Sequence, residues 1–123
     1  MEDIFILEDN TIDRRRMEGQ IPEELTYVLA KDGREFEDYL ANDGRARLYF
    51  LDDMVPDSSG NAGFHFIKHC THLTELRPDA KVFYTGSVPG SREEAYCGEH
   101  DIQIVQKSEI SDIIRGEFEK LKT

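Results

Sequence analysis

The stretch LYFLDDMVPDSSG, residues 48–60, decides the fold class of this chain. Its first four residues are all apolar, which is the pattern of a strand covered on both faces, because a strand with one solvated face alternates apolar and polar residues. Asp52 and Asp53 follow directly. A buried strand that ends in carboxylates is typical of a parallel α/β sheet, in which functional groups gather beyond the carboxyl ends of the strands.

Four further apolar runs have the same continuous character, and residues of chemical interest follow three of them. Glu8 and Asp9 follow the first run, Thr85 follows the fourth, and Lys107 lies just beyond the fifth. Because the carboxyl ends of parallel strands meet at one edge of a sheet, we expect these side chains to converge with Asp52. The four further runs are residues 4–7, 26–30, 81–84 and 102–105.

Amphipathic stretches with helical spacing separate these runs. Ser108 is expected to cap the last helix, and Ser91 with Glu94 predicts a capping box for a short one. The alternation of five strands and five helices predicts one domain, residues 1–123, with a doubly wound five-stranded parallel sheet, helices on both faces and right-handed crossovers. The apolar stripes are Phe36, Tyr39 and Leu40; Phe66, Cys70 and Leu73; and Ile110, Ile113, Ile114, Phe118 and Leu121.

Composition narrows the function classes. The 123 residues include 26 acidic and 15 basic ones, and the formal charge of −11 argues against nucleic acid as a partner. No apolar stretch approaches the roughly 18 residues that cross a membrane, and the N-terminus lacks a signal-peptide pattern. Cys70 and Cys97 have no disulfide-framework spacing, which favours reduced thiols and a cytoplasmic location.

The acidic residues at the predicted sheet edge point to a divalent cation. Two carboxylates about 4 Å apart repel by roughly 4 kcal/mol at an effective dielectric constant near 20, so Glu8, Asp9 and Asp52 need a cation between them. Oxygen ligands with room for water are typical of Mg²⁺ sites, and the backbone carbonyl of Met54 could complete the coordination. Taken alone, any one of these acidic residues is more often an ordinary charge in a solvated loop than a metal ligand.

Two other patterns, a set of three histidines and a run of three arginines, are better explained as solvated surface residues than as a metal or binding site. His65, His69 and His72 lie at i, i+4 and i+7 of the third predicted helix, and we expect them on a solvated face, away from its apolar stripe. His65 and His72 would be about 10 Å apart along the helix axis, so one tetrahedral ion could hardly take all three. The basic run at residues 14–16 is expected to be solvated charge, with contact to a partner protein as the alternative.

The order and spacing of these residues resemble the receiver domain of two-component response regulators over essentially the whole chain. Lys107 follows Thr85 by 22 residues, as is typical of the family. Thr85 follows Asp52 by 33 residues, a few more than usual, which we attribute to a longer third helix or to the loop after it. The matched motifs are an acidic pair (Glu8, Asp9), the stretch Asp-x-Met-x-Pro-x-x-x-Gly (Asp52, Met54, Pro56, Gly60), Thr before a small residue (Thr85, Gly86), and a lysine (Lys107).

This resemblance implies a flavodoxin-like sheet with strand order 2-1-3-4-5 and a stand-alone phosphoacceptor domain rather than an enzyme. Its register selects Asp52 over Asp53 as the residue that takes a phosphoryl group from a sensor histidine kinase or a histidine phosphotransfer protein. Lys107 and Thr85 would assist, and an unidentified protein downstream would read the signal. The resemblance assigns Mg²⁺, which Mn²⁺ could replace, to Glu8, Asp9, Asp52 and the Met54 carbonyl.

Departures from the family's pattern concern the surface that would report phosphorylation. Ser108 stands where receivers usually have proline, and Ile104 stands where a Tyr or Phe commonly couples the site to the outer face. The fourth predicted helix is short and poor in apolar residues. We therefore expect phosphorylation to act mainly on residues 87–98 through an order–disorder shift, with a rigid output face as the alternative.

Two other function classes remain open. A Mg²⁺-dependent phosphohydrolase could use an acidic strand edge, but it would leave Thr85 and Lys107 without a role. A receiver-like interaction module that works without phosphorylation would need the shape alone, but here the chemically active residues are complete. A test of phosphorylation by a small phosphodonor separates these classes.

Overall fold

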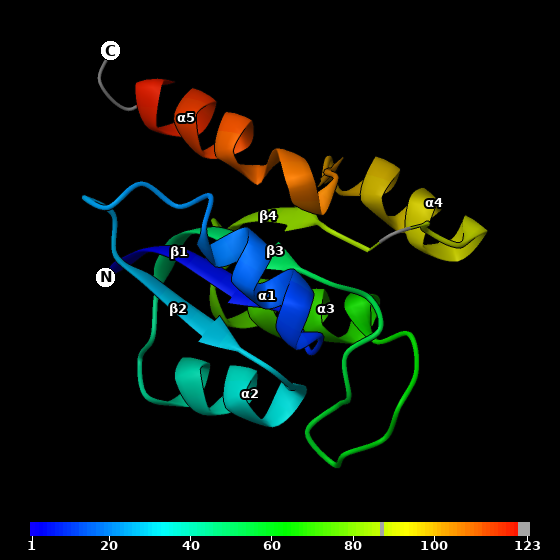
Figure 1. The fold of residues 1–123 in the computed structure, drawn as a ribbon. Coiled ribbons are helices and arrows are strands. Elements are labelled where there is room, and N and C mark those ends of the chain that lie inside the picture. Colours follow the sequence, from blue (N-terminus) through cyan, green and yellow to red (C-terminus); the bar gives the residue numbers. More distant parts are fainter. Residues whose placement is uncertain (87, 121–123) are drawn as a thin grey trace.

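A parallel sheet of five strands forms the centre of the fold in the computed structural model, which describes residues 1–86 and 88–120 (Figure 1). The strand order β2-β1-β3-β4-β5 is the predicted one. Leu51 pairs with Leu7 on one side and with Tyr84 on the other, so the first, third and fourth strands end at the same level. The strands are β1 (Glu2–Leu7), β2 (Tyr27–Ala30), β3 (Ala46–Leu51), β4 (Lys81–Tyr84) and β5 (Gln103–Ile104).

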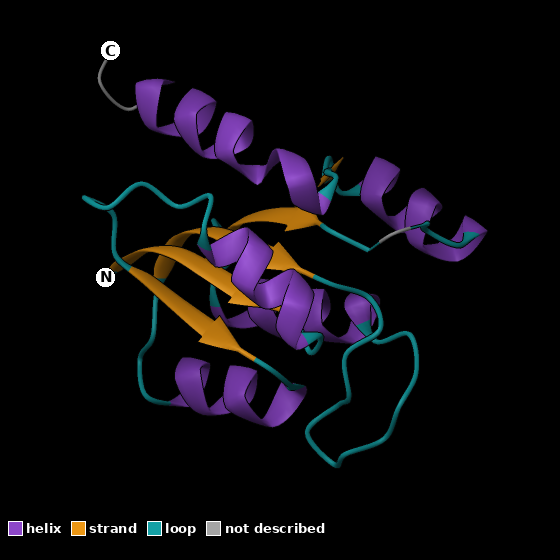
Figure 2. Cartoon of the chain, viewed as in Figure 1, coloured by secondary structure: helices purple, strands orange, loops and turns teal. Residues whose placement is uncertain are grey.

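Helices cover both faces of this sheet, as the continuous apolar runs predicted (Figure 2). Alternate strand residues face opposite layers. Phe50 of β3 packs with α1 and α5, whereas its neighbours Tyr49 and Leu51 pack with α2, α3 and α4. Within the described residues the helices are α1 (Thr11–Glu18), α2 (Gly33–Ala41), α3 (Phe66–Leu76), α4 (Ser91–Glu99) and α5 (Ile110–Lys120), with a 3₁₀ turn η1 (Lys107–Glu109) before α5.

Both predicted serine caps are wrong. Ser108 lies inside the 3₁₀ turn, and the side chain of Gln20, beyond α1, accepts a hydrogen bond from the backbone N–H of Ser111 and thus serves the start of α5. At α4, Ser91 is already the first helical residue. Gly90 occupies the cap position, and it has no side chain that could accept a hydrogen bond from the backbone N–H groups of the first turn. The helix starts were right to within a residue or two, but other groups satisfy their N–H groups.

The predicted solvated face of α3 is also wrong at His69. This side chain is only 4% exposed and packs edge-on against Phe36 of α2, with ring centroids 5.7 Å apart. Residues 66, 69, 70 and 73 follow i, i+3, i+4 and i+7, so His69 shares the buried stripe of α3. Cys70 is buried and free, as predicted. Leu121, assigned to the last apolar stripe, lies outside the described residues.

The long spacing between Asp52 and Thr85 comes from the loop before α3. The helix has 11 residues, an ordinary length, so the predicted extension of the helix or of the loop after it is wrong. Residues 52–65 instead form a wide loop between β3 and α3 (Figure 1). Asp57 organises this loop: its carboxylate accepts hydrogen bonds from the N–H groups of Ser59 and Asn61 and pairs with Lys68 of α3 at 3.1 Å.

None of the helices in the described part of the chain is long and apolar enough to cross a membrane.

Candidate functional site

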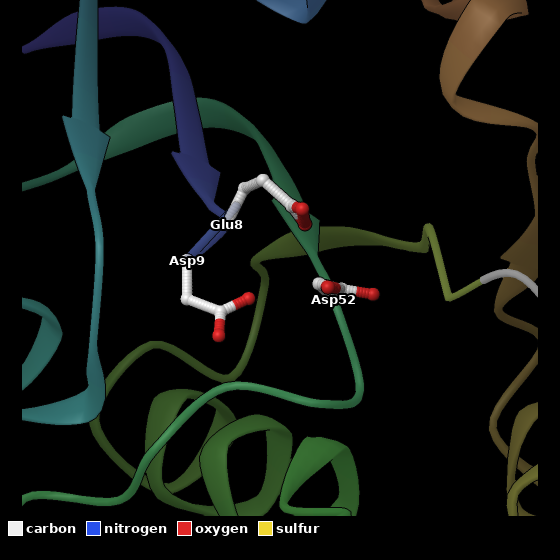
Figure 3. Close-up of side chains that lie close together, drawn as sticks. All are labelled: Glu8, Asp9 and Asp52. Atoms are coloured by element: carbon white, nitrogen blue, oxygen red, sulfur yellow. The ribbon is translucent and has the colours of Figure 1, made fainter. Parts of the chain in front are cut away.

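Three carboxylates meet at the carboxyl edge of the sheet. Because Leu7 and Leu51 are paired, the next residues in each strand, Glu8 and Asp52, become neighbours, and the N–H of Asp52 donates to the carbonyl of Leu7 at 3.1 Å. Asp9 follows in the loop after β1, and its carboxylate points toward the same space (Figure 3). One carboxylate oxygen from each of Glu8, Asp9 and Asp52 lies within 4.8 Å of the others.

The electrostatics of this cluster favour a positive charge between the carboxylates. Glu8 is fully buried, and burial, together with the hydrogen bond and charge of Asp52, raises the pKa of Glu8 to about 8. Burial and the Asp52 charge also raise the pKa of Asp9. The Oε2 atom of Glu8 has no hydrogen-bond donor among the described residues, so a proton or a cation is needed there. An all-carboxylate donor set at this spacing fits Mg²⁺.

Lys107 supplies the fixed positive charge of the site. Its ammonium Nζ lies 3.0 Å from Glu8, 3.2 Å from Asp13 and 3.4 Å from Asp52. Burial opposes its charge, but the hydrogen bond to Glu8 and the neighbouring carboxylates outweigh that effect and raise the pKa of Lys107. Asp13 was not predictable from the sequence, because its position on α1 relative to the sheet edge depends on the packing of that helix.

Two side chains outside the predicted set hold the loops of the site. Gln20 donates from Nε2 to the carbonyl of Lys107 at 2.7 Å and so fixes the 3₁₀ turn that carries the ammonium. Arg14 donates to the carbonyl of Glu8 at 3.0 Å and so braces the acidic loop after β1. Nothing in the sequence distinguished Gln20. Arg14 belongs to the basic run at residues 14–16, of which Arg15 and Arg16 are exposed, as predicted.

Thr85 and Met54 complete the predicted set. The N–H of Thr85 donates to the carbonyl of Leu51 at 3.0 Å, which places the threonine beside Asp52. Its side chain is buried, and Oγ1 has no hydrogen-bond partner within residues 1–86 and 88–120. Met54 is 58% exposed and lines a cavity of about 460 Å³ together with the three carboxylates and Lys107. Ile104, where the family resemblance led us to expect an aromatic residue, is exposed on β5.

Asp53 faces the opposite layer from Asp52. Its Oδ2 accepts a hydrogen bond from the hydroxyl of Tyr84 at 2.9 Å, and its Oδ1 accepts the N–H of Phe66 at the start of α3. Burial raises the pKa of Asp53 despite these two donors. Asp53 therefore belongs to the wall of the site rather than to its carboxylate cluster.

The comparisons with known proteins concern the fold. No family model matches the sequence, and no curated protein matches it. The signal receiver domain of an HD-domain-containing protein from Pseudomonas fluorescens is similar, with a TM-score of 0.76 and 15% identity over 97% of this chain and 95% of that one. A CheY-like receiver domain protein from Methanospirillum hungatei has a TM-score of 0.75 and 13% identity, covering 99% and 97% of the two chains.

A third similar structure is the isolated REC domain of RcsB from Salmonella enterica serovar Typhimurium, determined with the phosphomimetic BeF3−. It has a TM-score of 0.72 and 14% identity over 98% of this chain and 88% of that one. These receiver domains share with the present chain the sheet and the helices on both of its faces. The chain therefore has the fold of response regulator receiver domains.

Proposed function

We propose that this protein is a phosphoacceptor signalling domain in which Asp52 takes a phosphoryl group from a phosphohistidine in a Mg²⁺-dependent reaction. The donor would be a sensor histidine kinase or a histidine phosphotransfer protein, and the phosphorylated state would be read by a protein downstream. The protein would catalyse only its own phosphorylation and dephosphorylation.

The observation that carries this proposal is the placement of Lys107 against the carboxylate cluster. An ammonium within 3.4 Å of Glu8, Asp13 and Asp52 can balance the charge of Asp52 in the resting site and can later pair with a phosphoryl oxygen. Thr85, whose hydroxyl has no hydrogen-bond partner in the described part of the chain, lies beside Asp52. A simple metal-binding site would need neither the lysine nor the threonine.

The proposed reaction assigns one task to each side chain. A carboxylate oxygen of Asp52 attacks phosphorus, the phosphorus–nitrogen bond of the donor breaks, and the electron pair stays on the departing imidazole. Lys107 would pair with an oxygen of the transferred group, and the Thr85 hydroxyl would donate to another. Glu8, Asp9, Asp52 and the Met54 carbonyl would hold Mg²⁺, which supplies charge neutralisation at the phosphoryl oxygens.

Intact-mass measurement tests this function. The wild-type protein, incubated with acetyl phosphate and Mg²⁺, should gain one base-labile phosphate, and chelation of the metal should prevent the gain. Asp52→Asn should abolish it. Asp101→Asn is a matched control, because Asp101 is exposed, lies before β5 at the opposite end of the strands, and has a φ of 55° that asparagine tolerates.

Other results would favour the alternative classes. If the wild-type protein gains no phosphate although it binds Mg²⁺, the phosphoacceptor proposal is wrong and an interaction module is the better interpretation. Sustained release of inorganic phosphate from many donor molecules, with no acyl phosphate on Asp52, would instead indicate a phosphohydrolase.

A further inference from the structure

The ends of β3 and β4 present two pairs of side chains to opposite layers. Leu51 is paired with Tyr84, so Asp52 lies beside Thr85. Successive side chains of a strand alternate between faces. Thr85, like Phe83, belongs to the face that α1 and α5 cover, where Lys107 also contacts Asp52. Tyr84 and Asp53 belong to the face of α3, directly beneath the proposed phosphorylation site.

The Tyr84–Asp53 pair is tied firmly to α3. Asp53 accepts the N–H of Phe66 through its side chain at 3.2 Å and the N–H of His65 through its carbonyl at 2.9 Å. The ring of Tyr84 packs edge-on against that of Phe66, with centroids 4.7 Å apart. Both Tyr84 and Asp53 are buried, so the 2.9 Å hydrogen bond between them is shielded from water.

Movement of Thr85 cannot leave this hydrogen bond untouched. Tyr84 precedes Thr85 and Gly86 follows it, and Gly86 lies so close to the tyrosine hydroxyl that a β-carbon there would collide with it. If Thr85 is drawn toward a phosphoryl group on Asp52, both of its neighbours move with it. Asp53 is held by the start of α3, so the hydroxyl of Tyr84 is pulled away from it.

We propose that Tyr84 and Asp53 are positioning residues whose hydrogen bond holds Thr85 in the resting position and is released on phosphorylation. This inference rests on the proposed function, because it concerns the same site. The same hydrogen bond would couple the site to α4 through Phe66. The ring of Phe66 contacts Tyr84 on one side and, at 6.1 Å between centroids, Tyr96 of α4 on the other. Tyr84, an aromatic residue of β4, would thus couple the site to α4 in place of the aromatic side chain that is missing at Ile104 of β5.

Binding of beryllofluoride with Mg²⁺ tests this role, because the anion mimics a phosphoryl group on aspartate without the kinetics of transfer. Tyr84→Phe keeps the ring and removes the hydroxyl. If the hydrogen bond exists only in the resting state, its loss shifts the population toward the active state and tightens beryllofluoride binding by roughly tenfold. A merely structural role would lower stability in both states and leave the affinity unchanged.

A second variant and a control make the result specific. Asp53→Asn keeps an acceptor but removes the negative charge, so it should tighten binding by less, and the double variant should show no more effect than Tyr84→Phe alone. Tyr49→Phe removes a buried hydroxyl at the far end of β3, where it accepts the N–H of Ala46 at 2.9 Å, and should leave the affinity unchanged. Amide exchange of α4 should be faster in resting Tyr84→Phe than in resting wild type.

The possible failures are distinguishable. Unchanged or weaker beryllofluoride binding by Tyr84→Phe, in a protein whose wild type is phosphorylated on Asp52, would overturn the positioning role alone. Additive effects of Tyr84→Phe and Asp53→Asn would do the same, because they would show that the two side chains do not act through one hydrogen bond. Absence of phosphorylation and of beryllofluoride binding in the wild type would overturn the proposed function itself.

Discussion

His69 should make the stability of this protein depend on pH, and its replacement by leucine should remove that dependence. The imidazole lies between α2 and α3, where neither ring nitrogen has a hydrogen-bond partner among the described residues. Burial, and secondarily the positive charge available at His65, lowers the pKa of His69 from its ordinary value of 6.5 to about 4. The folded protein therefore holds this side chain neutral at a pH where the unfolded chain protonates it.

The size of the effect follows from the two pKa values. Above about pH 6.5 His69 is neutral in both states and contributes no pH dependence. As the pH falls from 6.5 to about 4, only the unfolded state gains the proton, so the free energy of unfolding decreases. Each pKa step of one corresponds to about 1.4 kcal/mol, which gives a loss of about 2 kcal/mol at about pH 5 and about 3 kcal/mol when the titration is complete.

Urea denaturation at about pH 7.5 and about pH 5 measures this loss. The free energy of unfolding of wild type should fall more steeply than that of His69→Leu by about 2 kcal/mol, and the comparison cancels the titration of every other group. His72→Gln, three residues along the same helix at a half-buried position, leaves His69 in place and is the matched control for removing a histidine from α3. Equal pH dependence of wild type and His69→Leu would refute the argument.

Two further predictions concern the metal and the packing of α2. Because the pKa of Glu8 is raised to about 8 and Mg²⁺ requires its carboxylate form, Mg²⁺ affinity measured by calorimetry should increase as the pH rises from about 6.5 to about 9, and a flat profile would contradict the assignment of Glu8 as a ligand. Gly33→Ala should destabilise the fold by about 1–3 kcal/mol, because its β-carbon would lie 2.7 Å from Nε2 of His69 and 2.9 Å from two backbone atoms. Gly116→Ala, with open space at its β-carbon in the interior of α5, should instead stabilise by about 0.5–1 kcal/mol, and thermal unfolding of the two variants compares them.

The sheet and the convergence of the site residues were predictable because they depend on few assumptions. Continuous apolar runs require strands covered on both faces, and parallel strands bring the residues after Leu7, Leu51 and Tyr84 to one edge. The motif register placed Asp52 in the carboxylate cluster and left Asp53 outside it, where its side chain faces α3.

Contacts between elements were not predictable from local patterns. Gln20 reaches Lys107 and Ser111 only because α1 and α5 lie on the same face of the sheet, and no residue near Gln20 signals this. His69 was misplaced for a different reason: its i+3 spacing from Phe66 was visible in the sequence, but a histidine on an apolar stripe was assigned by its polarity. In the folded protein the ring of Phe36 packs against the imidazole of His69, which is buried.

The ion pair between Glu8 and Lys107 joins residues 99 positions apart in the chain. The carboxylates of β1 and β3 are synthesised long before the ammonium that contacts them. A partly synthesised chain that has emerged as far as β4 would already contain Glu8, Asp9 and Asp52 but would lack their basic counterpart. Until Lys107 emerges, the edge of the sheet therefore holds its carboxylates without the ammonium that lies 3.0 Å from Glu8 in the folded protein, and this part of the site is completed late in synthesis.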